Sequence, residues 1–414
     1  MAFGQLLGSR HLGQVTFASV GSIENSTFPT SRLYVNWDRS TLSDYTGLNV
    51  PTGHTLPPTT EPEIGEAVLD WKLRHWRALS GYDGGSMKRL TNYAWISSTL
   101  ARLTDVELAA LVAKAPPLHA GVGGRSVLLT IDSTPIFVKR IPLTDRERRQ
   151  EHVLSTANLF DIPLCCHYGL GGPGFSAWRE LAATVIANGW VLSGACANFP
   201  LLYHWRVLPS DQREEFEGDV DFWTDSAAVR ARLEAIRDAT AHVVLFCEYI
   251  PQNLLEWLSE QVHESEEAAE TAIAFVDAHL APTIDFMNAR GLTHFDTHFE
   301  NITTDGRRFC FGDFGLALSL DFELTEEEVE FVVRHRRYDH GRTAVGYVHC
   351  LSAAFFGRDQ WKESLRAFLK TAQPPVLPSV AAAIQRQAPL ALAFLEFSRK
   401  LREEDKQTPY PAEL

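Results

Sequence analysis

Apolar residues recur every three or four positions along most of the second half of the chain. Over residues 267–290 this period is sustained and is followed by Gly291, a residue type that commonly ends helices. We therefore expect an amphipathic helix here, kinked at Pro282. Its apolar positions are Ile273, Val276, Leu280, Ile284 and Met287. The same period predicts further helices at residues 325–336, 342–356, 360–371 and 379–406.

β-branched and aromatic residues dominate shorter stretches in the middle of the chain. Residues 126–131 and 135–140 are two such stretches, and Asp132, Ser133 and Thr134 between them predict the tight turn of a β-hairpin. Residues 241–250 form a further apolar run.

The N-terminal part has a different character. Residues 1–65 are rich in Ser, Thr, Gly and Pro, which predicts an irregular extension. Helical spacing begins near residue 63 and continues to residue 111, where Thr104 and Glu107 form a capping-box sequence. The helix that they open has Leu108, Leu111 and Val112 on one face.

Composition limits the possible partners of the protein. The chain has 414 residues, and its 45% hydrophobic content is enough for the cores of two ordinary domains. Its formal charge of −14 argues against a nucleic-acid-binding surface, because such a surface needs clustered Lys and Arg. Short basic runs at residues 146–149 and 334–337 are interpreted as solvated faces.

Neither a membrane span nor a targeting segment is recognisable in the sequence. No run of about 18 apolar residues occurs, and the N-terminus lacks a basic region followed by an apolar core. We therefore expect a cytoplasmic protein that does not bind membranes. The six cysteines show no Cys-x-x-Cys spacing, which favours buried, reduced thiols over disulfides or a zinc site.

The most informative segment of the sequence is residues 291–315. It carries Asp296, Asn301 and Asp313, and the β-rich residues around Asp305 and Gly306 predict a hairpin that brings Asp313 back beside Asn301. In-line phosphoryl transfer needs a carboxylate near the acceptor hydroxyl and oxygen ligands for the metal on the phosphates. The spacing therefore predicts a phosphoryl-transfer site.

At this point the chain resembles the protein-kinase-like superfamily, whose catalytic loop reads His-x-Asp-x-x-x-x-Asn and is followed by Asp-Phe-Gly. The matching positions are His294, Asp296, Asn301, Asp313, Phe314 and Gly315. The resemblance implies an α+β fold with two lobes: a small antiparallel β lobe with insertions at residues 118–250 and a helical lobe at 251–414. Residues 1–117 then form an extension with accessory helices. ATP and Mg²⁺ are the implied cofactors, with Asp296 as the catalytic base and Asn301 and Asp313 as metal ligands.

The resemblance also assigns residues of the first lobe to ATP. Gly121, Gly123 and Gly124 match the glycine-rich turn over the phosphates, where backbone N–H groups approach oxygens without an intervening Cβ. An ordinary β-turn is the alternative for these glycines. Lys139, which follows three apolar strand residues, matches the lysine that contacts the α- and β-phosphates.

In the family this lysine pairs with a helical glutamate, for which the chain offers three candidates. Glu180 is favoured because apolar residues surround it at helical spacing, and this choice implies an insertion near residues 142–174. A second insertion, acidic and helical, is expected near residues 209–238. Glu147 and Glu151 lie nearer to Lys139 in sequence, but their Arg-rich surroundings favour a solvated surface. The apolar stripe beside Glu180 comprises Trp178, Leu181, Ala182 and Val185.

The end of the apolar run at residues 241–250 resembles the hinge between the two lobes. Glu248, Tyr249 and Ile250 would receive the adenine through their backbone atoms, and the side chains of Glu248 and Tyr249 can be purely structural. Asn253 would open the second lobe.

The chain departs from the family in the catalytic loop. Phe295 stands where many protein kinases carry the Arg that pairs with a phosphorylated segment, so this form of regulation is not expected. His298 stands two positions after Asp296, and a histidine at this position resembles the Asp-x-His-x-x-Asn loop of aminoglycoside-phosphotransferase-like enzymes. It can stabilise charge on the transferred group, contact the acceptor or simply support the loop. Asp339 either supports the catalytic loop or caps the next helix.

The resemblance implies a kinase that transfers the γ-phosphoryl group of ATP to a hydroxyl, with Ser or Thr of a protein as the favoured acceptor. No Ala-Pro-Glu follows Asp313, which leaves an aminoglycoside or another antibiotic-like small molecule as an alternative acceptor. A pseudokinase scaffold is a third possibility, and the complete set of catalytic groups argues against it. Four acidic residues suit a groove for a basic peptide or a pocket for a cationic molecule: Glu323, Glu326, Glu327 and Glu328.

Overall fold

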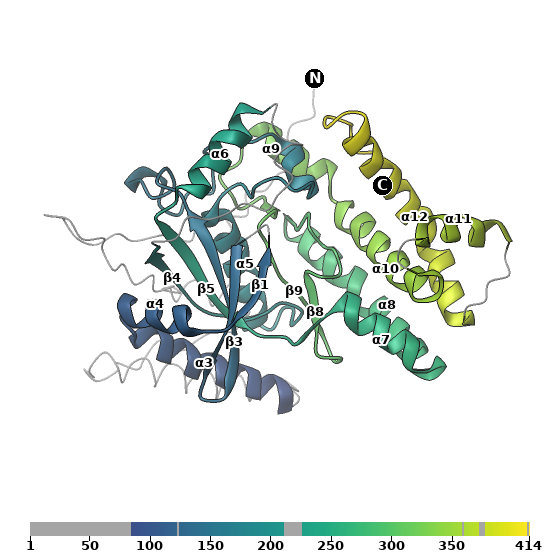
Figure 1. Ribbon diagram of the computed structural model, residues 1–414, viewed down its shortest axis with the longest axis horizontal. Coiled ribbons are helices and arrows are strands. Elements are labelled where there is room, and N and C mark those ends of the chain that lie inside the picture. Colours follow the sequence, from purple (N-terminus) through teal and green to yellow (C-terminus); the bar gives the residue numbers. More distant parts are fainter. Residues whose placement is uncertain (1–83, 122–123, 211–225, 358–359, 372–376, 412–413) are drawn as a thin grey trace, which may run out of the picture. The chain divides into compact units, whose positions relative to one another are not determined.

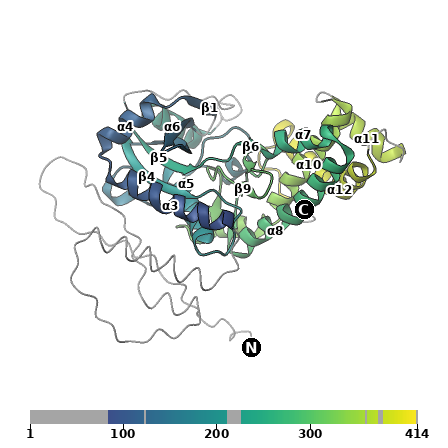
Figure 2. The same ribbon diagram turned by 90° about the horizontal axis from the view of Figure 1, so that it is seen from below.

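The computed structural model describes residues 84–121, 124–210, 226–357, 360–371, 377–411 and 414. All of these residues belong to one compact unit, Gly81–Leu414. Within this unit an antiparallel sheet lies towards one end and most of the helices lie towards the other (Figures 1 and 2). The described part is therefore α+β, with a small sheet and a mainly helical remainder. The predicted irregular extension at residues 1–65 lies outside the described residues.

The sheet has five strands in the order β1-β2-β3-β5-β4. Its strands are β1 (Pro117–Gly121), β2 (Gly124–Ile131), β3 (Thr134–Leu143), β4 (Leu202–Pro209) and β5 (Ala241–Glu248). Every pair of neighbours is antiparallel. The predicted hairpin is confirmed, because Asp132 and Ser133 both have positive φ, at 47° and 65°, in the two-residue turn between β2 and β3. Strand β4 was not predicted.

Alternation along β3 sends neighbouring side chains to opposite faces of the sheet. Ile136 and Val138 point into the larger core, which extends to α3 (Gly84–Arg102) and α4 (Asp105–Lys114). Phe137 and Ile141 face the smaller core beside α5 (Ala177–Leu192). Lys139 has the same parity as the second set, and this register places it on the face that α5 covers.

The helical part consists mainly of α7 (Leu254–Glu264), α8 (Glu266–Ala289), α10 (Tyr338–Phe356) and α12 (Pro378–Glu403). Shorter helices are α6 (Ala227–Arg237), α9 (Glu326–Arg334) and α11 (Trp361–Thr371). The predicted apolar stripe of α8 is confirmed, since all five of its residues are buried. Pro282 lies inside this helix. Asn253 caps α7 by accepting a hydrogen bond from Glu256 N.

Small two- and three-stranded sheets connect the two parts. Strands β8 (Ile302–Thr304) and β9 (Phe309–Phe311) form the predicted hairpin around Asp305, with β6 (Gln252–Asn253) at its edge. Strand β7 (Leu292–Thr293) pairs with β10 (Leu318–Ser319). These pairs fix both ends of residues 294–317.

Several local predictions hold and others do not. The capping box of Thr104 and Glu107 is present, with Leu108 and Val112 buried. The apolar stripe proposed for α5 is wrong at Val185, whose side chain is 39% exposed. None of the six cysteines, all of which the structure describes, forms a disulfide. Burial is confirmed for Cys166, Cys247, Cys310 and Cys350, whereas Cys165 and Cys196 are half-buried.

Candidate active site

Lys139 lies at the centre of a buried charge cluster. Its Nζ is 2.7 Å from Glu180 Oε1 and 2.8 Å from Asp313 Oδ1. The predicted pair with Glu180 is therefore present. Glu180 lies in the first turn of α5, where Ser176 Oγ caps the helix by accepting hydrogen bonds from Trp178 N and Arg179 N.

The cluster contains more negative than positive charge, because one lysine serves two carboxylates. Burial and, to a smaller extent, the negative charge of Asp313 raise the pKa of Glu180 to about 7 against the attraction of Lys139. Although desolvation acts to raise it, the charge and hydrogen bond of Lys139 hold the pKa of Asp313 below its usual value. Burial would lower the pKa of Lys139, but the two carboxylates raise it, so the ammonium group stays protonated.

The backbone of residues 294–295 is held by Asp339 at the start of α10. Its two carboxylate oxygens each accept a hydrogen bond of 2.8 Å, one from His294 N and the other from Phe295 N. These bonds support the unusual backbone of Phe295, whose φ is 65°. Asp339 therefore supports the loop, and the alternative role as a helix cap is wrong, because Arg337 occupies the N-cap position of α10.

Phe295 packs among aromatic side chains. Its ring is fully buried and lies 5.0 Å from Tyr338 and 5.5 Å from Phe331, measured between ring centroids. His294 ties the same loop to Gly312, because its Nε2–H donates to Gly312 O at 2.8 Å. The loop is thus fixed by neutral contacts as well as by Asp339.

Asp296 and Asn301 are brought together as the sequence predicted. Asn301 Nδ2 donates to both the carbonyl and Oδ2 of Asp296, each at 3.0 Å. Burial raises the pKa of Asp296, while Arg342 on α10 opposes this shift and Asp313 adds to it. A raised pKa makes a carboxylate a stronger base, which suits proton acceptance from a hydroxyl.

His298 lies beside Asp296, and its imidazole ring is neutral at pH 7. Its Nε2 is 3.6 Å from Asp296 Oδ1, and its Nδ1 is 3.5 Å from Glu300 Oε2. Burial and the nearby positive charge of Arg342 lower its pKa to about 4. A neutral ring favours hydrogen bonding over the charge stabilisation that the sequence left open.

The groups that could hold a metal are Asn301 and Asp313. Gly312 N donates to Asn301 O at 3.0 Å, so the hairpin places the two residues side by side. Their carboxylate and amide oxygens are ligands that Mg²⁺ accepts, and this ion commonly completes its shell with phosphates and water. Within the part of the chain that the structure describes, no three His, Cys, Asp or Glu side chains form a complete metal site by themselves. Asn301 and Asp313 alone would leave most of the coordination shell of Mg²⁺ to other oxygen ligands.

Glycines keep space around the charge cluster. A Cβ on Gly315 would lie 3.3 Å from both Asp313 Oδ1 and Glu180 Oε2, so a side chain there would crowd the two carboxylates. In the glycine-rich turn, Gly121 and Gly124 pair at the end of the β1–β2 hairpin. Gly123 lies outside the described residues.

At the position that resembles a hinge, the side chain of Glu248 forms two ion pairs with arginines. The carboxylate of Glu248 pairs with Arg89 of α3 at 2.6 Å and with Arg308 at 2.9 Å. Arg89 also donates to Ala197 O and Phe199 O. The side chain of Glu248 therefore joins α3 to the β8–β9 hairpin. Tyr249 and Ile250 follow it directly.

The prediction that Glu147 lies on a solvated surface is wrong. This side chain is fully buried and pairs with Arg232 of α6 at 2.8 Å. Its Oε1 also accepts a hydrogen bond from Ala177 N at 2.8 Å, so it caps α5. A local signal was present, because Thr144 and Glu147 have capping-box spacing and make its hydrogen bonds. Glu151 is exposed, as expected.

Two of the four acidic residues proposed as a substrate-binding surface have other partners. Glu328 is buried against Arg179 at 2.7 Å. Glu323 accepts hydrogen bonds from the backbone of Thr156 and Ala157. Glu328 therefore binds α5 and Glu323 binds the segment before it, which corrects the interpretation that all four acidic residues line a groove or pocket.

Sequence reasoning missed three residues around the site. Arg342 influences the pKa of both Asp296 and His298, and Arg179 neighbours Glu180. Gly169 has a φ of 64°, and a Cβ there would lie 3.4 Å from Asp296 Oδ1. Neither arginine has a local sequence signal, whereas the Gly-Leu-Gly-Gly run that begins at Gly169 was a sign of close backbone approach.

Neither a family model nor a curated protein matches the sequence. Among the helices in the described ranges, none combines the length and apolar composition needed to cross a bilayer.

Proposed function

We propose that the protein is a kinase-like phosphotransferase that uses ATP and Mg²⁺ to phosphorylate a hydroxyl. The observation that carries the proposal is the convergence of Lys139, Glu180 and Asp313 at distances of 2.7 and 2.8 Å from three distant parts of the chain. Perturbed carboxylates of this kind concentrate at functional sites. The strand order and the β8–β9 hairpin are compatible with the two-lobed fold that the motifs imply.

Each residue then has a role that follows from its position. Lys139, held by Glu180, binds phosphate oxygens as a point charge. Asp296 orients the acceptor hydroxyl and takes its proton, aided by its raised pKa. Asn301 and Asp313 would hold Mg²⁺, which neutralises charge on the β- and γ-phosphates. Catalysis is then mainly positioning and charge stabilisation.

The acceptor is a protein hydroxyl or a small-molecule hydroxyl. The Asp-Phe-Gly sequence and the hinge-like strand favour the first. One observation favours the second: residues 155–174 pack on the segment after Gly315, and Gly169 approaches Asp296. An extended peptide beside Asp296 would compete with this packing for the same space.

One experiment tests the function and separates the acceptors. The purified protein is incubated with γ-labelled ATP, Mg²⁺ and an extract of the source cells, with the Asp296→Asn variant as the matched control. Label in proteins supports the first acceptor and label in small molecules the second. Nucleotide binding without transfer of label would instead support the scaffold alternative, and absence of both would refute the proposal.

A further inference from the structure

We propose that Arg179 and Glu328, together with Thr156, form a permanent latch that fastens the segment after Gly315 to α5. The latch keeps Glu180 against Lys139 without phosphorylation of that segment. Its consequence for catalysis rests on the proposed function, whereas its mechanical part does not.

The core of the latch is a buried ion pair. Arg179 and Glu328 are 2.7 Å apart, and their side chains are only 1% and 2% exposed. The guanidinium of Arg179 also lies over the rings of Phe175 and Phe322, at 5.2 and 5.9 Å from their centroids. Separating the pair would leave a buried charge without its partner, which is strongly unfavourable.

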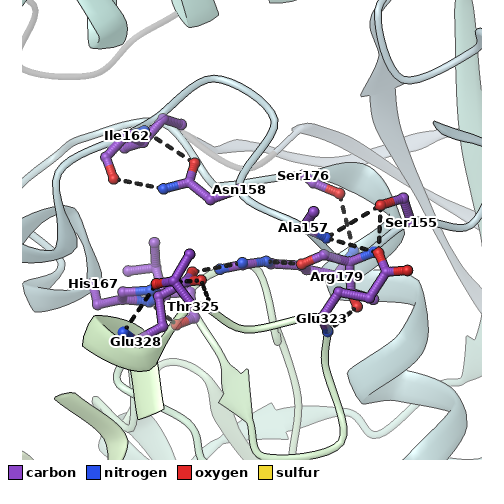
Figure 3. A network of polar contacts seen from close by, with 12 residues as sticks. Ser155, Ala157, Asn158, Ile162, His167, Ser176, Arg179, Glu323, Thr325 and Glu328 are labelled. Atoms are coloured by element: carbon purple, nitrogen blue, oxygen red, sulfur yellow. Dashed lines mark hydrogen bonds and ion pairs between the residues drawn. The ribbon is translucent and has the colours of Figure 1, made fainter. Parts of the chain in front are cut away.

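Thr156 joins the ion pair to the segment before α5, and its neighbours Ser155 and Ala157 are drawn beside Glu323 in Figure 3. Its carbonyl accepts a 2.6 Å hydrogen bond from Arg179 Nε, and its Oγ1 accepts one of 2.8 Å from Glu323 N. The carboxylate of Glu323 in turn accepts from Thr156 N at 3.0 Å. The insertion, α5 and residues 323–328 are therefore bonded to one another at a single place.

A second set of contacts holds the start of the same segment. His167 Nδ1–H donates to Leu316 O at 2.8 Å, and a Cβ on Gly174 would lie only 3.0 Å from Gly315 O. Tyr168 contacts His335, just after α9, through a 2.7 Å hydrogen bond. Residues 316–335 are thus attached to the insertion at both ends.

The latch bears on the active site because Arg179 and Glu180 are consecutive residues of one helix. A movement of α5 that withdrew Glu180 from Lys139 would also pull Arg179 from Glu328. The buried pair therefore opposes such a movement. Within this segment the acidic partner of Arg179 is a glutamate, which is part of the sequence itself, whereas a phosphate must be added by another enzyme.

The hydroxyl groups of the segment are already engaged in its own structure. Ser319 and Thr325 are the Ser and Thr residues between Leu316 and Glu328. Ser319 is buried, and its Oγ accepts from Asp321 N at 3.2 Å. Thr325 Oγ1 caps α9 by accepting from Glu328 N at 3.2 Å.

The test is native-state hydrogen exchange of the full chain, with Glu328→Gln as the variant. Gln retains the capping box with Thr325 but removes the charge that Arg179 needs. We expect amide exchange in residues 177–182 and 316–324 to accelerate by about tenfold or more, as the buried pair is lost. Glu327→Gln changes an exposed neighbour on the same helix and should exchange like the wild type.

Steady-state kinetics show whether the latch positions Glu180 for catalysis or only stabilises the packing around α5. With saturating ATP, kcat of Glu328→Gln should fall about tenfold or more while KM for the acceptor changes little, because Glu180 and Lys139 act on the phosphates. Arg179→Lys keeps the charge and should recover part of the loss relative to Arg179→Gln. Phosphatase-treated wild type should match untreated protein in exchange and in kcat.

Wild-type exchange in both segments of Glu328→Gln would overturn the latch. So would faster exchange confined to residues 155–157 with unchanged kcat, or a loss of protection after phosphatase treatment. If Glu328→Gln does not fold, Glu323→Gln at the exposed edge of the latch replaces it, with faster exchange expected in residues 155–157 and 316–324. A wild type without phosphotransfer would refute the proposed function, and the exchange pattern would still decide the latch.

Discussion

Arg179 and Glu180 are neighbours on α5, and each forms a buried ion pair at 2.7 Å, yet the two pairs differ in their charge balance. Arg179 meets one carboxylate, Glu328, and its remaining contacts are to a carbonyl and two aromatic rings. Glu180 meets Lys139, which also holds Asp313. The first pair is balanced, whereas the second has one negative charge in excess.

The difference separates a structural ion pair from one that is prepared for a ligand. A balanced, hydrogen-bonded pair gains nothing from a further charge. Burial, together with the negative charge of Asp313, raises the pKa of Glu180 to about 7. A cation beside Asp313, whose side chain is 39% exposed, would relieve the excess negative charge. Local electrostatic conflict of this kind is expected at functional sites.

The largest expected effect tests this comparison directly. Asp313→Asn should abolish Mg²⁺-dependent turnover, because the metal would lose its carboxylate ligand. The free energy of unfolding should change by less than about 1 kcal/mol, since Lys139 and Glu180 remain as a balanced pair. Chemical denaturation and a kinase assay measure the two quantities. Unchanged turnover would remove Asp313 from the site, and strong destabilisation would make the Lys139 cluster as structural as the Arg179 pair.

Asp296 belongs to neither ion pair, so its substitution should affect chemistry alone. Asp296→Asn should lower kcat by a factor on the order of 10² to 10⁴, the usual contribution of a positioned base. Nucleotide affinity and stability should stay close to the wild type. Equilibrium ATP binding and single-turnover transfer check these expectations. A collapse of ATP affinity with normal chemistry at saturation would show that the role assigned to Asp296 is wrong.

The sequence predicted the residues at the Lys139 cluster better than those at the Arg179 pair, and the reason is the range over which each signal acts. Asp296, Asn301 and Asp313 lie within one short segment whose hairpin is readable from local composition. Lys139 and Glu180 were chosen from the family resemblance, supported by the apolar strand residues before Lys139 and the apolar helical spacing around Glu180.

Long-range charge pairing could not be predicted in the same way. Arg179 and Glu328 are 149 positions apart, and Glu147 and Arg232 are 85 apart. Sequence composition treats such residues as surface, because isolated charges are rarely buried. Only the three-dimensional structure shows that Arg179 pairs with Glu328 and that Glu147 pairs with Arg232. The same limit applies to Arg342 and to the bonds of Arg89 with Glu248.

Asp339 differs from the ion-paired Glu180 and Glu328, because its carboxylate accepts hydrogen bonds from backbone N–H groups. Asp339→Ala should lower the free energy of unfolding by about 2–4 kcal/mol, because two buried N–H groups would lose their acceptor. Chemical denaturation measures this loss, and Asp285→Ala serves as control because that side chain is 71% exposed. A variant as stable as the control would mean that aromatic packing of Phe295 alone holds the loop.

The smallest expected effect is a pH dependence of the free energy of unfolding that arises from His335. Burial lowers the pKa of His335, which bonds Tyr168, from 6.5 to about 4. The unfolded chain then binds a proton before the folded chain does, so this contribution to stability is present above pH 6.5 and is lost as the pH falls towards 4. From pH 7 to pH 6 the loss should be about 0.7 kcal/mol. Glu180 acts in the opposite direction, because its raised pKa favours the folded state as the pH falls through about 7. The measurement is therefore the difference between the wild type and His335→Gln, in which the Glu180 contribution cancels. If the free energies of unfolding of the two proteins vary with pH in parallel, His335 is not held neutral by the fold. The contact of His335 with Tyr168 would then make no pH-dependent contribution to stability.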